Sequence, residues 1–196
     1  MQVEEYPFHQ IHTKKEAKKS LVHLLQNAHA GEKAAANAYW GHAHSIFVTD
    51  GQERAEILKI YSEEIHHRES LKKLLTQLES QPRILREWAM WCIGAMIAIF
   101  SFIGTWFIPM YGAGRLESTN IGEYEIAARL AFLAGEKQMA DELLTFGEIE
   151  WDHEAYFRKK TQGHFLAQWV PLWKAPKVRQ EILNSFNEFK TLNEKL

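Results

Sequence analysis

Apolar residues along this chain recur at intervals of three and four, which is the spacing of one face of an α-helix. Strand-like alternation of polar and apolar residues is hard to find. The helical pattern fills four windows that contain no proline: residues 14–47, 52–79, 118–134 and 136–161. Thr49-Asp50-Gly51 separates the first two windows as a turn, and Ala134-Gly135 separates the last two. The sequence therefore predicts an all-α fold built on four bundle helices.

The expected ends of the later helices follow from capping residues. Ser118 or Thr119 is the expected N-cap of the third helix, and Gly163 closes the fourth. The tail, residues 164–196, contains a short amphipathic stretch near 177–192, which we expect to pack back onto the bundle. A chain of 196 residues is long enough for one core and short for two, so 1–196 is interpreted as a single domain.

Composition excludes several classes of function. The formal net charge is only −2, and neither a GxGxxG run nor a Walker-type loop occurs, so we expect no nucleic-acid or nucleotide partner. The single cysteine, Cys92, permits no disulfide framework and is expected to be an inert packing residue. The first residues lack the apolar core of a secretory signal and the arginines of a transit peptide, which favours a cytoplasmic location.

Glu-x-x-His places a carboxylate and an imidazole on neighbouring turns of one helix face. The three occurrences are Glu63-x-x-His66, Glu64-x-x-His67 and Glu150-x-x-His153. One such match by itself is more often a surface pair than a pair of metal ligands, so helical phase has to discriminate.

Phase separates the two overlapping pairs on the second helix. Glu64 and His67 are in register with the isoleucines and leucines of that helix, so we expect them to face the core. Glu63 and His66 share a face with charged residues such as Lys59, which is typical of a solvated surface. We therefore expect replacement of Glu63 to be almost neutral.

The other helices each supply one inward acidic position. On the fourth helix, Glu150 and His153 are in register with leucine and phenylalanine residues. On the first helix, Glu32 is the one charged residue on an apolar stripe. On the third helix, Glu123 shares a face with apolar residues, whereas its rival Glu125 shares a face with Arg129, so Glu123 is preferred.

One glutamate from each of two helices, with Glu-x-x-His from each of the other two, is the ligand pattern of di-metal carboxylate bundles. Charged groups enter a core only when they are compensated, because an unpaired buried ion costs several kcal/mol. Four carboxylates and two imidazoles suit two irons, with manganese as the alternative, better than tetrahedral zinc. The predicted ligands are Glu32, Glu64, His67, Glu123, Glu150 and His153.

Residues 88–114 contain no charged side chain, which by length alone is typical of a membrane-spanning helix. A single span would, however, leave Glu64 and Glu150 on opposite sides of the bilayer. The bundle topology instead requires a connection that returns along the bundle, and about 24 residues of helix cover about 36 Å. We therefore interpret residues 84–111 as an apolar crossover helix.

The crossover is apolar on every face, so packing against the bundle leaves a hydrophobic surface exposed. Trp88, Trp91 and Trp106 lie near its ends, as tryptophans do at membrane interfaces. We predict peripheral membrane association through residues 88–111. The alternative is that the same surface joins copies of the chain in a homo-oligomer.

These motifs resemble those of the demethoxyubiquinone hydroxylases, di-iron enzymes that hydroxylate a late quinone precursor in ubiquinone biosynthesis. His29-Ala30-Gly31-Glu32 followed by Ala35, Tyr39 and Gly41 is similar to that family's HAGE run. That family also carries a Glu-Glu pair on its third helix and, further along, a His-Tyr pair near the metals. Counted from Glu123, the His-Tyr positions hold Arg129 and Leu130 here, a departure from the family pattern.

The resemblance implies a ferritin-like fold and an oxygen-activating di-iron monooxygenase that hydroxylates a quinone-like or other lipid-soluble substrate. Its electrons would come from NADH or another reductant. The alternative is an iron-oxidising and iron-storing protein without an organic substrate, although storage needs a hydrophilic shell that the apolar crossover disfavours. A metal-free helical scaffold at the membrane is a third hypothesis, and the inward carboxylates count against it.

Overall fold

The computed structural model describes residues 3–103 and 105–193, so positions 1–2, 104 and 194–196 of the predicted domain lie outside the described residues. Within this part of the chain the structure is all-α, as predicted, and contains no strand. The helices are α1 (Lys14–Ala43), α2 (Gly51–Gln77), α3 (Ile84–Ile103), α4 (Phe107–Ala134), α5 (Lys137–Gln162) and α6 (Arg179–Asn193). Short 3-10 helices cover Val3–Glu5, Phe8–Gln10 and Phe165–Gln168.

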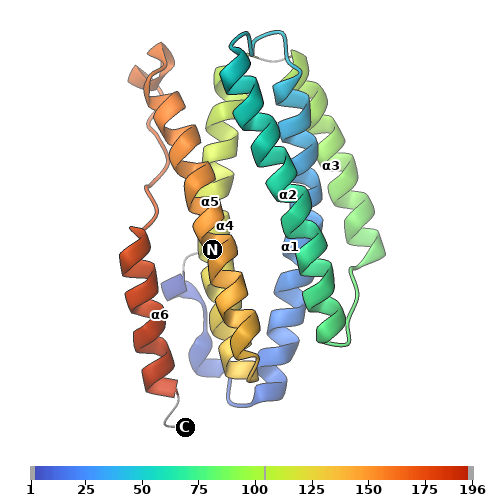
Figure 1. Ribbon diagram of the computed structural model, residues 1–196, viewed down its shortest axis with the longest axis vertical. Coiled ribbons are helices and arrows are strands. Elements are labelled where there is room, and N and C mark those ends of the chain that lie inside the picture. Colours follow the sequence, from blue (N-terminus) through green and yellow to red (C-terminus); the bar gives the residue numbers. More distant parts are fainter. Residues whose placement is uncertain (1–2, 104, 194–196) are drawn as a thin grey trace.

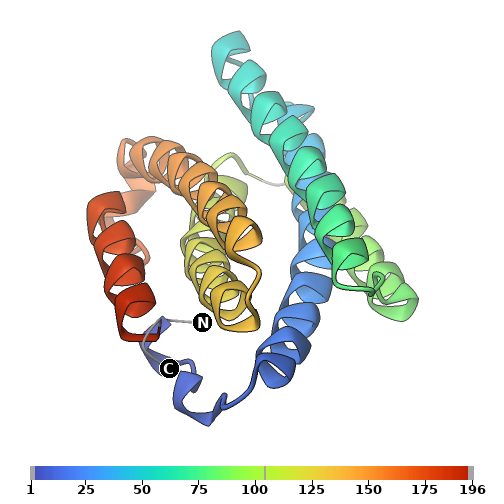
Figure 2. The same ribbon diagram turned by 60° about the horizontal axis from the view of Figure 1, so that its bottom comes forward.

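Two helical hairpins form the body of the bundle (Figure 1). Helix α1 packs on α2, α4 packs on α5, and the two hairpins meet mainly through α1 and α4. Helix α3 connects the hairpins and packs along α1, while α6 lies on α4 at the opposite edge of the molecule (Figures 1 and 2). The returning connection that the sequence predicted is therefore present.

Local capping explains where the first hairpin turns. The Asp50 side chain accepts a hydrogen bond from the Gln52 amide, so the predicted turn is the N-cap of α2. Helix α1 ends at Ala43, earlier than the predicted residue 47. Arg54 of α2 donates to the carbonyl oxygens of Ala43 and Val48 at 2.9 and 2.6 Å, which satisfies carbonyls left free where the helix stops.

Helix α4 begins at Phe107, well before the predicted start at residue 118. Pro109 falls in the first turn, where a helix needs no backbone N–H donor. Gly114 lies inside the helix because its face is covered by Trp173, whose ring occupies the space that a β-carbon would need. Ser118 is therefore no N-cap, and its hydroxyl donates to the Lys174 carbonyl instead.

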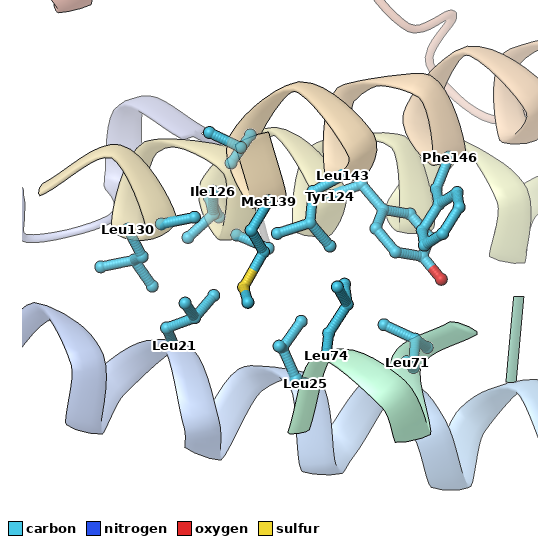
Figure 3. Close-up of a cluster of buried hydrophobic side chains, with 14 of the residues drawn as sticks. Leu21, Leu25, Leu71, Leu74, Tyr124, Ile126, Leu130, Met139, Leu143 and Phe146 are labelled. Carbon is cyan, nitrogen blue, oxygen red and sulfur yellow. The ribbon is translucent and has the colours of Figure 1, made fainter. Parts of the chain in front are cut away.

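Two apolar clusters fill the bundle at different heights. The larger lies where α1, α2, α4 and α5 pack near the α4–α5 turn, and Phe186 of α6 joins it, which confirms that the tail packs back on the bundle. Figure 3 shows its side chains pointing inward from all four helices: Leu21, Leu25, Leu71, Leu74, Tyr124, Ile126, Leu130, Met139, Leu143 and Phe146. The smaller cluster includes Tyr39, Ile57, Met110 and Phe157. Each bundle helix thus carries a short segment between the two clusters.

Helix α3 approaches α1 closely through small residues. A β-carbon at Gly94 would lie 2.7 Å from the Ala34 Cα, and one at Gly41 would overlap the Ala98 backbone. Cys92 and many of the large apolar side chains of α3 are exposed, so the prediction that Cys92 is a packing residue is wrong. Among the described residues, α3 is the one helix long and apolar enough to cross a membrane, and 11% of its most apolar window is buried.

Candidate metal centre

The segments between the two apolar clusters bring carboxylates and imidazoles together from all four bundle helices. One group comprises Glu32, Glu64, His67 and Glu150, and a second comprises Glu64, Glu117, Glu150 and His153. Within each group the potential ligand atoms lie within 4.8 Å of one another. Glu64 and Glu150 belong to both groups, so they are the two carboxylates that the candidate ligand sets share.

All six side chains are buried, and Glu64, Glu117 and Glu150 have no exposed surface. Several of their polar atoms have no hydrogen-bond partner, including both carboxylate oxygens of Glu64 and Nδ1 of His153. Buried polar atoms are nearly always satisfied in folded proteins, so a group of orphaned lone pairs directed at one place requires an explanation. A bound cation supplies one.

The contact between His67 and Glu150 leads to the same conclusion. His67 Nδ1 lies 2.9 Å from Glu150 Oε1, but the two atoms do not form a hydrogen bond of acceptable geometry. Two electron-pair donors approach each other in this way when both bind the same ion. The residues present are therefore a suitable ligand set for two divalent transition-metal ions.

The electrostatics of the cluster are those of an uncompensated anionic site. Burial raises the pKa of Glu32, and burial together with the neighbouring carboxylates raises the pKa values of Glu64 and Glu117 well above their ordinary value. Burial would raise the pKa of Glu150 too, but its contacts with Glu117, His153 and His67 hold that pKa below the usual range. Keeping all four carboxylates ionised at this depth would therefore require positive charge nearby.

Two tyrosines bind the outer carboxylates of the cluster. The Tyr39 hydroxyl of α1 donates to Glu117 of α4, and the Tyr124 hydroxyl of α4 donates to Glu32 of α1. Burial and the nearby carboxylates raise both tyrosine pKa values, which keeps the phenols protonated as donors. The arrangement is reciprocal, because each helix donates a tyrosine hydrogen bond to the glutamate of the other. On each helix the tyrosine stands seven residues after the glutamate.

The structure brings together five of the six predicted ligands and replaces the sixth. Glu123 belongs to neither group, and Glu117 provides the carboxylate of α4 in its place. The error follows from starting the helix at residue 118, which left Glu117 in a loop. The repeated spacing of Glu32 to Tyr39 and Glu117 to Tyr124 is the sequence signal that identifies it.

The rival residue on α4 has a different partner. Glu125 is buried and forms a 2.6 Å ion pair with Arg129, four residues further along the same helix. The preference against Glu125 as a ligand therefore agrees with the structure. Glu123 instead lines a neighbouring cavity, where burial raises its pKa.

Glu63 has a partner that its surface position did not indicate. Its Oε2 lies 2.9 Å from His153 Nε2, while His153 Nδ1 faces Glu64 at 3.3 Å. Because a carboxylate only accepts, Nε2 carries the proton, and the lone pair of Nδ1 points into the cluster. The structure thus gives Glu63 a contact that argues against the expectation that its replacement is almost neutral. In the described part of the chain no second carboxylate binds His67 in this way, and its ring packs on Phe146, with ring centres 4.8 Å apart.

A cavity of about 860 Å³ lies beside the cluster, between α1, α3 and α4. Its lining is mostly apolar, and it reaches Glu32, Tyr39 and Tyr124. One side of the candidate metal centre is therefore next to a space large enough for an organic molecule, as expected of ligand-binding sites.

Comparison of the chain with family models, with curated proteins and with solved structures finds no match. The candidate site therefore rests on the convergence, burial and unsatisfied atoms of its own side chains.

Glu117 and Glu123 provide a matched test of the site. We expect Glu117→Gln to lower the iron or manganese bound per chain, because it removes a carboxylate from the cluster, and Glu123→Gln to leave the bound metal unchanged. The measurement is metal analysis of protein loaded anaerobically with ferrous or manganous ions. Equal loss in both variants, or loss in Glu123→Gln alone, would show that the assignment is wrong.

Replacement of Glu63 should weaken metal binding without abolishing it. A carboxylate that orients a ligating histidine typically contributes about 10- to 100-fold in metal affinity. We expect a loss in this range for Glu63→Ala, measured by competition with a chelator, and little change for Glu69→Ala, an exposed glutamate on the same helix. Identical affinities for wild type and Glu63→Ala would contradict a positioning role.

Proposed function

We propose that the protein is a di-iron oxygenase that hydroxylates a lipid-soluble substrate at a membrane surface. The observation that supports this most strongly is the buried cluster of four glutamates and two histidines beside an apolar cavity of about 860 Å³. A metal-binding role alone accounts for the cluster, but it does not account for the cavity beside it.

The ligand arrangement supports a ferritin-like di-metal centre. Helices α1 and α4 each contribute one glutamate, and α2 and α5 each contribute Glu-x-x-His. Glu64 and Glu150, which belong to both groups, would hold the ions together with Glu32, Glu117, His67 and His153. Four carboxylates balance the charge of two divalent ions, with iron favoured and manganese as the alternative.

Including Glu117 also strengthens the resemblance to the demethoxyubiquinone hydroxylases. Counted from Glu117 instead of Glu123, the positions of the family's His-Tyr pair hold Glu123 and Tyr124. The tyrosine is therefore present, and its hydroxyl binds Glu32. The histidine is replaced by Glu123, which supports a substrate that differs from that of the family.

A bound iron pair would supply the activation of dioxygen, and the protein would supply geometry and an anhydrous site. Tyr39 and Tyr124 hold the outer carboxylates in place, and Asn120 donates to Glu117 and Glu150 at 2.9 and 3.4 Å. The apolar clusters above and below exclude water, and the cavity orients the substrate. Hydroxylation inserts one oxygen atom into a C–H bond and reduces the other to water, using two electrons from a reductant such as NADH and two protons, at least one of them from solvent.

Helix α3 supports a membrane location for this reaction. It forms one wall of the cavity through Ile93, Ile97 and Phe100, and its outer face exposes further large apolar side chains. Trp88 and Trp91, which are 64% and 46% exposed, lie near its first turns. An apolar substrate could pass from the bilayer to the cavity beneath α3 without crossing water. The chain would then be a peripheral protein of the cytoplasmic face.

Oxygen incorporation tests the proposed reaction. Protein loaded with ferrous iron, given a reductant, ¹⁸O₂ and a demethoxyquinone with a ten-carbon chain or 1-decanol, should yield a product that contains one ¹⁸O atom. Glu64→Ala should abolish the product, because it removes a shared carboxylate. Oxygen consumption that yields ferric mineral and no oxygenated organic product with either compound would favour iron oxidation instead.

Membrane association can be tested on the outer face of α3. Ile99 and Ile103 are 60% and 63% exposed and do not line the cavity. We expect the double change Ile99→Glu and Ile103→Glu to reduce sedimentation with phosphatidylcholine vesicles by at least about tenfold, since it places two charges in the interface. Leu192→Glu, an exposed leucine of α6, is the matched control. Vesicle-independent oligomers that dissociate in the double variant would favour self-association.

A further inference from the structure

One end of the cavity contains a histidine whose ring has no partner in the described structure. His42, in the last turn of α1, lines the cavity and is 2% exposed. Neither Nδ1 nor Nε2 forms a hydrogen bond. Leaving a buried polar group unsatisfied is costly, so such groups are uncommon unless something else binds them.

The neighbouring polar groups are already engaged. Glu53 is the carboxylate whose charge raises the pKa of His42. It accepts hydrogen bonds from the Trp106 indole and the Lys160 ammonium group. The Ser45 hydroxyl donates to the carbonyl of Phe102. Among the described residues, the imidazole therefore has no hydrogen-bond partner.

The imidazole is uncharged at neutral pH. Burial lowers the pKa of His42 to about 4, despite the opposing effect of Glu53. A neutral imidazole has one N–H donor and one acceptor nitrogen, which suits a hydroxyl or a carbonyl group. It does not suit a carboxylate, whose burial without a cation is costly.

His42 also has a defined place relative to the metal centre. It follows Glu32 by ten residues on the same helix, which corresponds to about 15 Å along the helix axis. Helices α1 and α3 run in the same direction, since Gly94 lies against Ala34 and Gly41 against Ala98. Arg86, the cation of the cavity lining, stands in the first turn of α3 and hence towards the other end.

We propose that His42 binds the neutral oxygen group, a hydroxyl or carbonyl, of a long-chain apolar ligand whose chain lies in the cavity and passes Glu32. This proposal names a substrate class for the proposed oxygenase, and the identification of the ligand as a substrate rests on that proposed function. Glu32 lies about 15 Å from His42 along α1, so an extended ten-carbon alcohol bound at His42 would reach most of the way to the metal centre. A quinone with its ring beside the metals would instead leave His42 without a partner.

The test uses protein loaded with ferrous iron under anaerobic conditions, so that binding is measured apart from oxygen chemistry. Isothermal titration calorimetry at pH 7.5 compares 1-decanol with decanoate. We expect wild type to prefer the alcohol. His42→Phe should bind 1-decanol about tenfold more weakly, the upper range for a lost hydrogen bond, and His42→Gln should retain affinity within about threefold because the amide both donates and accepts. His44→Phe, at an exposed histidine outside the cavity, should bind as wild type does.

Thermal unfolding separates a ligand-binding role from a structural one. Without ligand, His42→Phe should unfold at the same temperature as wild type or higher, because the change removes an unsatisfied polar group. The rise in unfolding temperature that 1-decanol causes in wild type should be smaller in this variant. A lower unfolding temperature with unchanged decanol affinity would overturn the proposal, as would equal losses of affinity in His42→Phe and His42→Gln.

The result is independent of the oxygenase test. Decanol binding that depends on His42, with no oxygenated product, would refute the proposed reaction and leave the binding site in place. Product formation with a His42→Phe variant that binds decanol normally would refute the site and leave the reaction in place.

Discussion

The mutual repulsion of four carboxylates at one level of an apolar interior is the constraint on which the rest of the structure depends. Glu32, Glu64, Glu117 and Glu150 are packed between two hydrophobic clusters, so water cannot screen their charges. Without cations, burial raises the pKa values of Glu32, Glu64 and Glu117, and the polar atoms around them stay unsatisfied. Divalent ions bound by these carboxylates would instead stabilise the packing of the four helices.

The two hairpins that carry the site are alike in sequence as well as in shape. The first helix of each hairpin contains a glutamate that is followed seven residues later by a tyrosine. The second helix of each contains Glu-x-x-His. The tyrosines exchange hydrogen bonds between α1 and α4, so each hairpin orients a carboxylate of the other. Placing both hairpins at the same level requires α2 and α4 to run in the same direction. This requirement explains why a long helix, α3, must return along the outside of α1.

Helical phase predicted much of this arrangement, because the inward positions of α1, α2 and α5 follow from a 3.6-residue period. It located Glu32, Glu64, His67, Glu150 and His153. It failed for α4, because a proline and two glycines near its start are normally typical of a loop, and only tertiary packing against Trp173 makes Gly114 favourable in a helix. It failed for Glu63 because the partner, His153, lies on another helix. The cavity depends on how α3 rests on α1, which no local pattern encodes.

The two sides of the candidate centre differ in a way that suits an oxygenase better than a storage site. On one side His153 is bound by Glu63, which is 32% exposed and lies 3.8 Å from the surface residue Lys59, so this side communicates with solvent. On the other side Glu32 borders the apolar cavity, and His67 packs on Phe146. A hydroxylation consumes protons and also needs an apolar substrate shielded from water. A polar connection on one side of the centre would supply the protons, and an apolar cavity on the other side would hold the substrate. Iron storage needs polar access alone.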